Sequence, residues 1–156
     1  MRNLGMVINT RVFGEVTIED NKLIHFPGGI VGFPELKDFA LIHDPDQGEN
    51  GGIRWMQSVQ EPQFAMPVID PLRVKADYNP VVEDDLLAPL GEIDTKELLV
   101  LVTITVPSDL TKMTVNLKAP FIINAANRRA AQIIGEGYDV RFPVYEILQK
   151  LKKEGE

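Results

Sequence analysis

The side chains that could take part in catalysis or metal binding are few in this sequence. It contains no cysteine, which excludes thiol nucleophiles, thiolate metal sites and disulfides. The two histidines, His25 and His43, each lie beside apolar residues in strand-like stretches, which favours a structural role over that of a base or ligand. Asp70 could serve a hydrolase together with a second carboxylate, but capping of the turn at Pro71 explains it better. We therefore expect no enzymatic activity, no metal site and no cofactor.

Two loop motifs also differ from known ligand-binding patterns. Residues 26–33 (FPGGIVGF) are rich in glycine but lack the G-x-G-x-x-G spacing and the Lys-Ser/Thr pair of phosphate-binding loops. Because this turn is so apolar, we expect it either to tuck over the core or to present a docking surface. Residues 44–46 (DPD) resemble the start of a calcium loop, but Glu49 and Trp55 stand where an EF-hand needs Gly and Glu. A turn explains these residues better.

Charge is distributed unevenly along the 156 residues, whose formal net charge is −7. Residues 1–110 carry 8 basic and 18 acidic side chains, whereas residues 111–156 carry 8 basic and 5 acidic ones. The densest acidic stretch spans residues 77–97. This balance argues against direct binding of nucleic acid, which needs clustered Lys and Arg. The stretch is either a solvated surface or a face that attracts a basic partner and repels RNA or DNA.

Short segments with strand-like patterns make up most of the chain. Alternation over residues 12–18 predicts a strand, and the turn at Asp20-Asn21 predicts that residues 22–26 return as its hairpin partner. The apolar, β-branched run 98–106 predicts a central strand buried on both faces. Further strands are expected at 39–44, 53–59, 64–70, 113–119 and 121–124, with residues 45–52 as a hairpin loop.

Two helices are expected, at 82–87 and 144–153; Pro80 and Pro89 keep the first one short. Residues 127–134 could form a helix or the return strand after 121–124, and we favour the hairpin. The pattern predicts a mostly β, small antiparallel barrel or sandwich with a short acidic helix and a C-terminal helix. We expect one domain over residues 1–156, with residues 152–156 frayed. Neither a membrane span nor a secretory signal is expected.

Several motifs, taken in order, resemble those of a known family. Individually they are weak, but their order and spacing are specific, and they cover the chain from about Ile8 to Leu148. They are TRVFGE (10–15), FPGGIVGF (26–33), FAMPVIDP (64–71), TVP (105–107), MTVNLKAP (113–120), IIN (122–124), Arg128 and QII (132–134). On these residues the chain resembles the flagellar assembly factor FliW family.

The resemblance implies a small, cytoplasmic, barrel-like monomer that binds proteins and has no catalytic activity. Members of this family bind newly made flagellin and also CsrA, a dimeric RNA-binding translational repressor. CsrA that is bound in this way cannot hold flagellin messenger RNA. Accumulating flagellin takes the factor away and frees CsrA to repress translation. The alternative is another small β-barrel protein that acts as a chaperone or regulator without catalysis. Two hypotheses about function of a different kind are an enzyme and a nucleic-acid-binding barrel.

Candidate contact residues follow from the charge pattern and from the motifs together. We expect the antagonism of CsrA to act without occupying its RNA site, through repulsion or a change of conformation. The apolar turn at residues 30–33 and the strand at residues 113–120 are candidates for a groove or strand edge that receives a flagellin segment. The candidates for CsrA binding are Glu83, Asp84, Asp85, Asp70, Asn116 and Asn124. The candidates for flagellin binding are Ile30, Val31, Phe33, Met113, Val115 and Leu117.

Overall fold

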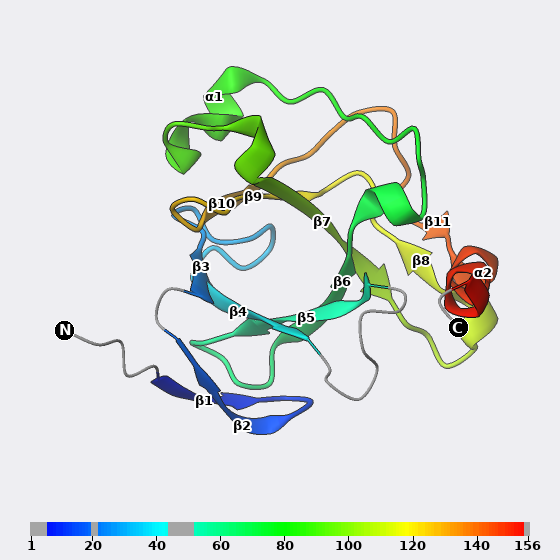
Figure 1. Cartoon of the computed structure of the whole chain (residues 1–156), viewed down its shortest axis with the longest axis horizontal. Coiled ribbons are helices and arrows are strands. Elements are labelled where there is room, and N and C mark those ends of the chain that lie inside the picture. The colour runs from blue at the N-terminus through cyan, green and yellow to red at the C-terminus, as the bar shows by residue number, and fades with distance from the viewer. Residues whose placement is uncertain (1–5, 20–21, 44–51, 155–156) are drawn as a thin grey trace.

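Seven strands form a closed barrel in the computed structural model, which describes residues 6–19, 22–43 and 52–154. Neighbouring strands are antiparallel except β3 and β10, which run parallel and meet only at Arg129 and His25. Pairing of β7 with β9 closes the ring (Figure 1). The barrel strands are β3 (Leu23–His25), β4 (Asp38–His43), β5 (Arg54–Ser58), β6 (Ala65–Ile69), β7 (Leu98–Thr105), β9 (Phe121–Asn124) and β10 (Arg129–Gln132). The predicted mostly β, barrel-like fold is confirmed.

Two short strands and a helix extend the barrel beyond β7. The strand β8 (Thr114–Val115) pairs with the end of β7, and β11 (Phe142–Pro143) pairs with β8. The C-terminal helix α2 (Tyr145–Glu154) lies beside these two strands (Figure 1). The strand predicted over 113–119 is therefore mostly wrong. Its chain turns after Val115 because the side-chain oxygen of Asn116 accepts hydrogen bonds from the backbone N–H groups of residues 118 and 119.

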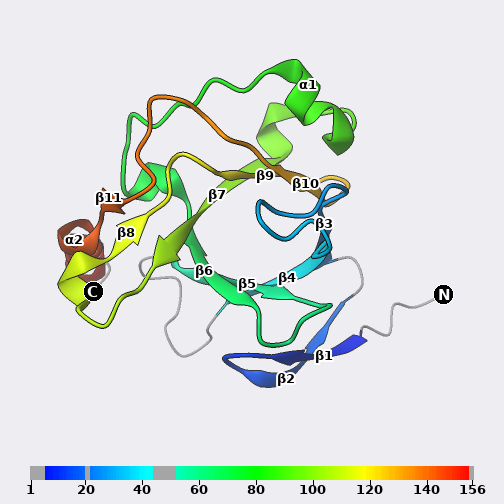
Figure 2. The same ribbon diagram turned by 180° about the vertical axis from the view of Figure 1, so that it is seen from behind.

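The N-terminal segment forms a separate two-stranded hairpin outside the barrel, as Figures 1 and 2 show from opposite sides. Strand β1 (Met6–Thr10) pairs with β2 (Gly14–Ile18) over five residue pairs. The hairpin predicted between residues 12–18 and 22–26 is therefore wrong. Strand β2 pairs instead with the preceding strand β1, whose sequence does not clearly alternate apolar and polar residues.

The turn of this hairpin explains the pairing. The hydroxyl of Thr10 donates to the carbonyl of Gly14 at 2.7 Å and accepts from the N–H of Phe13 at 2.9 Å. Gly14 has φ +68°, a conformation that favours glycine. Ile8 and Ile18 then pack on the outer side of β4 and β5, around Trp55.

Aromatic residues fill one end of the barrel. Phe26 is fully buried and meets Phe39 and Phe121 edge to face, with ring centroids 5.4 Å apart in both pairs. On β7, the consecutive residues Leu101 and Val102 are both buried, one in the barrel and one in a second core under α2. This confirms the prediction that residues 98–106 form a central strand buried on both faces.

Both predicted helices are present. The acidic helix α1 (Asp84–Leu87) continues into a 3-10 turn at Ala88–Leu90, and α2 starts after Pro143 as expected. The β9–β10 pairing confirms the hairpin over 121–134. The strands β4 and β5 pair in antiparallel fashion, whereas the predicted loop between them, with its DPD motif, lies outside the described residues over 44–51. In the described ranges no helix is long and apolar enough to cross a membrane.

Candidate functional site

The acidic helix α1 presents its carboxylates to solvent. Glu83, Asp84 and Asp85 are all exposed, and the last two occupy the first turn, where the helix dipole favours negative charge. The helix does not extend because Pro89 follows it closely. The structure thus brings these three CsrA candidates together on one exposed element.

Asn124 anchors the acidic segment rather than facing solvent. It is 1% exposed, and its side-chain N–H groups donate to the carbonyl oxygens of Leu90 and Glu92 at 3.0 and 2.9 Å. Its side-chain oxygen accepts from the N–H of Ala126 at 3.1 Å. Asn124 is therefore a positioning residue that ties β9 to the chain after α1.

An apolar groove of about 460 Å³ lies between α1, the 3-10 turn Pro71–Arg73 and the start of β7. It is lined mainly by apolar side chains, among them Val82, Leu87 and Leu98. Asp70 stands at its rim, where its carboxylate also caps the 3-10 turn by accepting from the N–H of Leu72 at 2.9 Å. The groove therefore joins Asp70 to the acidic helix, whereas Asn116 serves a turn in another part of the fold.

Tyr78 closes one side of this groove and carries a perturbed phenol. Its hydroxyl donates to the carbonyl of Leu117 at 2.7 Å, and its ring contacts Tyr138 edge to face at 4.6 Å. Burial, and to a smaller extent the charge of Tyr138, raises the pKa of Tyr78 to about 12. Just before Tyr78 in the chain, the ammonium of Lys75 pairs with the exposed carboxylate of Asp77 at 3.0 Å. This contact lowers the pKa of the Asp77 carboxyl.

The apolar turn, residues 30–33, both tucks over the barrel and remains partly exposed. Ile30 is 6% exposed and belongs to the barrel core, whereas Val31 and Phe33 are 55% and 41% exposed. Ile30 and Phe33 exchange two backbone hydrogen bonds around a tight turn. Gly29 precedes it with φ +71°, and a Cβ at that position would overlap the backbone of Pro34. One side chain of the turn, Ile30, thus tucks into the core, and two others, Val31 and Phe33, are exposed on the surface.

The turn and the acidic helix are neighbours in space. A cavity of about 240 Å³ lies beside the turn and is lined by Ile30, Val31, strand β10 and Pro89. Pro89 belongs to the 3-10 turn that continues α1, and Leu87 lines the groove on the other side. No local pattern indicates that Pro89 joins the two candidate surfaces, because the turn and β10 are distant from it in the chain.

The second group of flagellin candidates lies differently. Val115 and Leu117 are 0% and 1% exposed in the core under α2, and Met113 is half-buried against the same core. The free edge of β8 is occupied by β11. A partner could reach Val115 or Leu117 only if α2 and β11 moved, so these residues support a surface rather than form one.

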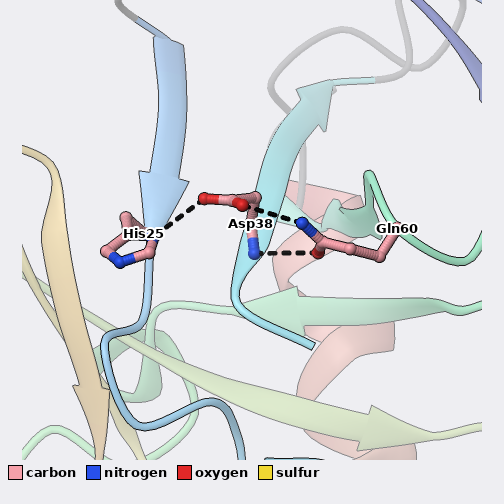
Figure 3. A network of polar contacts seen from close by, with 3 residues as sticks. All are labelled: His25, Asp38 and Gln60. Atoms are coloured by element: carbon pink, nitrogen blue, oxygen red, sulfur yellow. Dashed lines mark hydrogen bonds and ion pairs between the residues drawn. The ribbon is translucent and has the colours of Figure 1, made fainter. Parts of the chain in front are cut away.

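Neither histidine is part of a catalytic arrangement in the described residues. Figure 3 shows His25 bound through Nδ1 to the carboxylate of Asp38 at 2.8 Å, with Gln60 bonded to the other side of Asp38. His25 and Gln60 are exposed and Asp38 is half-buried, and together they link β3 to β4 and to the β5–β6 loop. Within the described ranges, no hydroxyl bonds to either histidine, and no group of three metal-ligating side chains occurs.

Comparison with known proteins agrees with this arrangement. The chain matches the FliW protein family over residues 7–145. It is 47% identical over 152 residues to the flagellar assembly factor FliW of Lachnoclostridium phytofermentans, covering 96% of this chain and 97% of that protein. It is 43% identical over 148 residues to that of Lachnospira eligens, covering 93% and 98%.

A solved structure supports the same relationship. The crystal structure of a flagellar assembly factor FliW superposes with a TM-score of 0.78 at 27% identity, covering 88% of this chain and 94% of the other. The similarity therefore extends over most of both chains rather than over a single motif. The chain belongs to the FliW family of flagellar assembly factors.

Proposed function

We propose that this chain is a cytoplasmic, non-enzymatic, single-domain monomer that binds flagellin and the translational repressor CsrA. In binding CsrA it would keep the repressor from flagellin messenger RNA, so that the message is translated. The observation that carries this proposal is membership of the FliW family over residues 7–145. The acidic helix α1 and the exposed part of the apolar turn are the surfaces that we propose for the two partners.

The acidic helix is the proposed contact for CsrA. An RNA-binding repressor must present basic surface to phosphates, and exposed Glu83, Asp84 and Asp85 are complementary to such a surface. The same charges repel RNA, so they would weaken RNA binding near the contact without occupying the RNA site. Asp70, at the rim of the adjoining groove, extends this acidic surface.

The exposed part of the apolar turn is the proposed contact for flagellin. Val31 and Phe33 offer apolar area beside a small cavity, which suits the apolar face of an amphipathic segment. Because Pro89 lies between this turn and the groove beside α1, two bulky partners would interfere sterically. Such interference is a physical basis for the exchange of one partner for the other.

Charge reversal tests the CsrA contact. The triple variant Glu83→Lys, Asp84→Lys, Asp85→Lys should weaken CsrA binding by about tenfold or more, while flagellin binding changes little, because it reverses the complementary charges. Isothermal titration with each partner measures both affinities. The matched control reverses Glu15, Glu136 and Asp139, which are exposed on other parts of the surface. Equal effects of the two triple variants on CsrA would contradict the assignment.

A substitution in the turn tests the flagellin contact. Val31→Asp should weaken flagellin binding by about tenfold, since it places a charge on the proposed apolar contact. Val140→Asp, at a residue with a similar exposure of 53%, is the control. Wild-type flagellin affinity in Val31→Asp would refute the contact.

The exchange of partners has its own test, in which CsrA is titrated into the preformed complex of this protein with flagellin. Full binding of both partners at once would refute mutual exclusion.

A further inference from the structure

The two ends of the barrel differ in how they are closed. At one end, Phe26, Phe39 and Phe121 fill the interior completely. At the other end, the inward-facing leucines Leu41 and Leu99 are only half-buried. Two adjoining hollows of about 460 and 640 Å³ open there, and they share Leu41, Leu99 and Arg54. The open end thus has an apolar floor that is accessible from outside.

Strand alternation places polar residues at this mouth. On β5, Arg54 points to the same side as buried Met56, and on β4 its pairing partner His43 points to the same side as Leu41. Arg73 and Arg128 line the same hollows from the turns after β6 and before β10. The mouth is therefore basic at its rim and apolar inside.

Within the ranges that the structure describes, the cations at the mouth exceed the carboxylates. Those that line it include Lys22 and three arginines, against the two acids Glu19 and Asp70, although the whole chain has a net charge of −7. Among the described residues, none of these four cations forms an ion pair, since the ion pairs found there are His25–Asp38 and Lys75–Asp77. Within the part of the chain that the structure describes, no carboxylate therefore pairs with the four charges that an anion would meet at the mouth.

Backbone with positive φ occurs at Arg128 and beside the side chain of Arg73. Arg128 has φ +60°, and its N–H and C=O are fixed by hydrogen bonds to Asn124 and His25 at 2.6 and 2.9 Å. Such strained residues occur preferentially at functional sites. Gly52 has φ +70°, and a Cβ there would approach the Arg73 guanidinium nitrogen to 2.7 Å. The glycine allows Arg73 to lie across the rim.

We propose that this mouth binds a small-molecule monocarboxylate with an unbranched apolar tail, the chemistry of a medium-chain fatty acid. The tail lies against Leu41 and Leu99, and the carboxylate meets the guanidinium of Arg54, a geometry in which arginine binds carboxylates strongly. The hollows fall within the usual size of small-ligand sites, and their charged groups surround the apolar floor that Leu41 and Leu99 form. This site adjoins the groove beside α1 through Asp70 and Leu99, and it shares no lining residue with the cavity beside the apolar turn.

Octanoate is the probe for the test, with isothermal titration and amide chemical shifts of the intact protein as readouts. We expect one octanoate per chain and shifts at residues 41 and 99. Acetate, which lacks the tail, and octan-1-ol, which lacks the charge, should bind at least about tenfold more weakly. No binding of octanoate would overturn the proposal, as would equal binding of either control compound.

Variants locate the site. Arg54→Gln should weaken octanoate binding by about tenfold, whereas Arg141→Gln, which removes an exposed arginine elsewhere, should leave it unchanged. Thermal unfolding verifies that each variant is folded, and Arg128→Gln replaces Arg54→Gln if the latter is not. Equal loss in Arg141→Gln, or unchanged affinity in the mouth variant, would overturn the assignment.

Discussion

At the scale of single residues, the polar side chains of the family motifs mainly hold backbone in place. Asp70 caps a 3-10 turn, Asn116 bends the chain after β8, and Asn124 accepts and donates three backbone hydrogen bonds. Each was a candidate partner contact by its motif alone. Of the three, only Asp70 also stands at the rim of a groove, so the other two influence binding through the shape of the protein.

Tyr78 gives the protein a specific sensitivity to alkaline pH. Its pKa is about 12 in the folded protein, against about 10 in an unfolded chain. Folding therefore favours the protonated phenol, and this contribution is fully present below about pH 10 and is lost as the pH rises to about 12. Between these values the free energy of unfolding should fall on the order of 2 kcal/mol more in the wild type than in Tyr78→Phe.

Urea unfolding at about pH 9 and about pH 11.5 measures that difference. Tyr145→Phe, in the half-exposed first turn of α2, is the control and should follow the wild type. The assignment fails if Tyr78→Phe loses as much stability as the wild type over this range.

At the scale of elements, short segments are held by neighbours rather than by their own propensity. The helix α1 has four residues, too few to be stable alone. Asn124 of β9 and Asn127 of the following turn both donate to the carbonyl of Leu90, just after this helix. The acidic surface is thus positioned by a hairpin that lies more than thirty residues away in the chain.

Asn124→Ala tests this dependence. The substitution leaves the carbonyl oxygens of Leu90 and Glu92 without these donors, and we expect it to lower the free energy of unfolding by about 2 kcal/mol. Amide hydrogen exchange should become faster over residues 84–97 than over β4 and β5. Asn79→Ala, at an exposed asparagine, should change neither quantity by much. Uniformly faster exchange across the barrel would show that Asn124 supports the whole fold instead.

At the scale of the whole molecule, the barrel is stabilised mainly from its aromatic end. Phe26 is fully buried among Phe39 and Phe121, whereas Leu41 at the open end is half-buried. The loop that carries Phe26 and the apolar turn curls over the barrel interior in both views (Figures 1 and 2). The proposed flagellin contact is therefore built directly on the main core.

Two truncations compare the ends. Phe26→Ala should lower the free energy of unfolding by about 3–5 kcal/mol, because it removes a fully buried ring and leaves a cavity. Leu41→Ala should cost less than about 2 kcal/mol, since its side chain is already partly hydrated. Chemical denaturation gives both values. Similar costs would mean that the open end is as tightly packed as the aromatic end.

The sequence by itself determined the class of fold, most strand positions, the exposed acidic helix and the family. These features follow from local alternation, turn residues, charge and ordered motifs, all of which are visible along the chain. The β9–β10 hairpin and the doubly buried β7 were predictable for the same reason. The β1–β2 hairpin was missed because β1 lacks clear alternation and packs only half of its residues on the barrel.

Only the tertiary structure decided which of the chosen residues are accessible and which surfaces adjoin. Val115, Leu117 and Asn124 look like neighbouring motif residues in the chain, yet all three are buried. The proximity of the apolar turn to α1, and the ring of arginines at the open mouth, arise from barrel closure between distant strands. Closure depends on long-range pairing and packing, to which no local pattern corresponds.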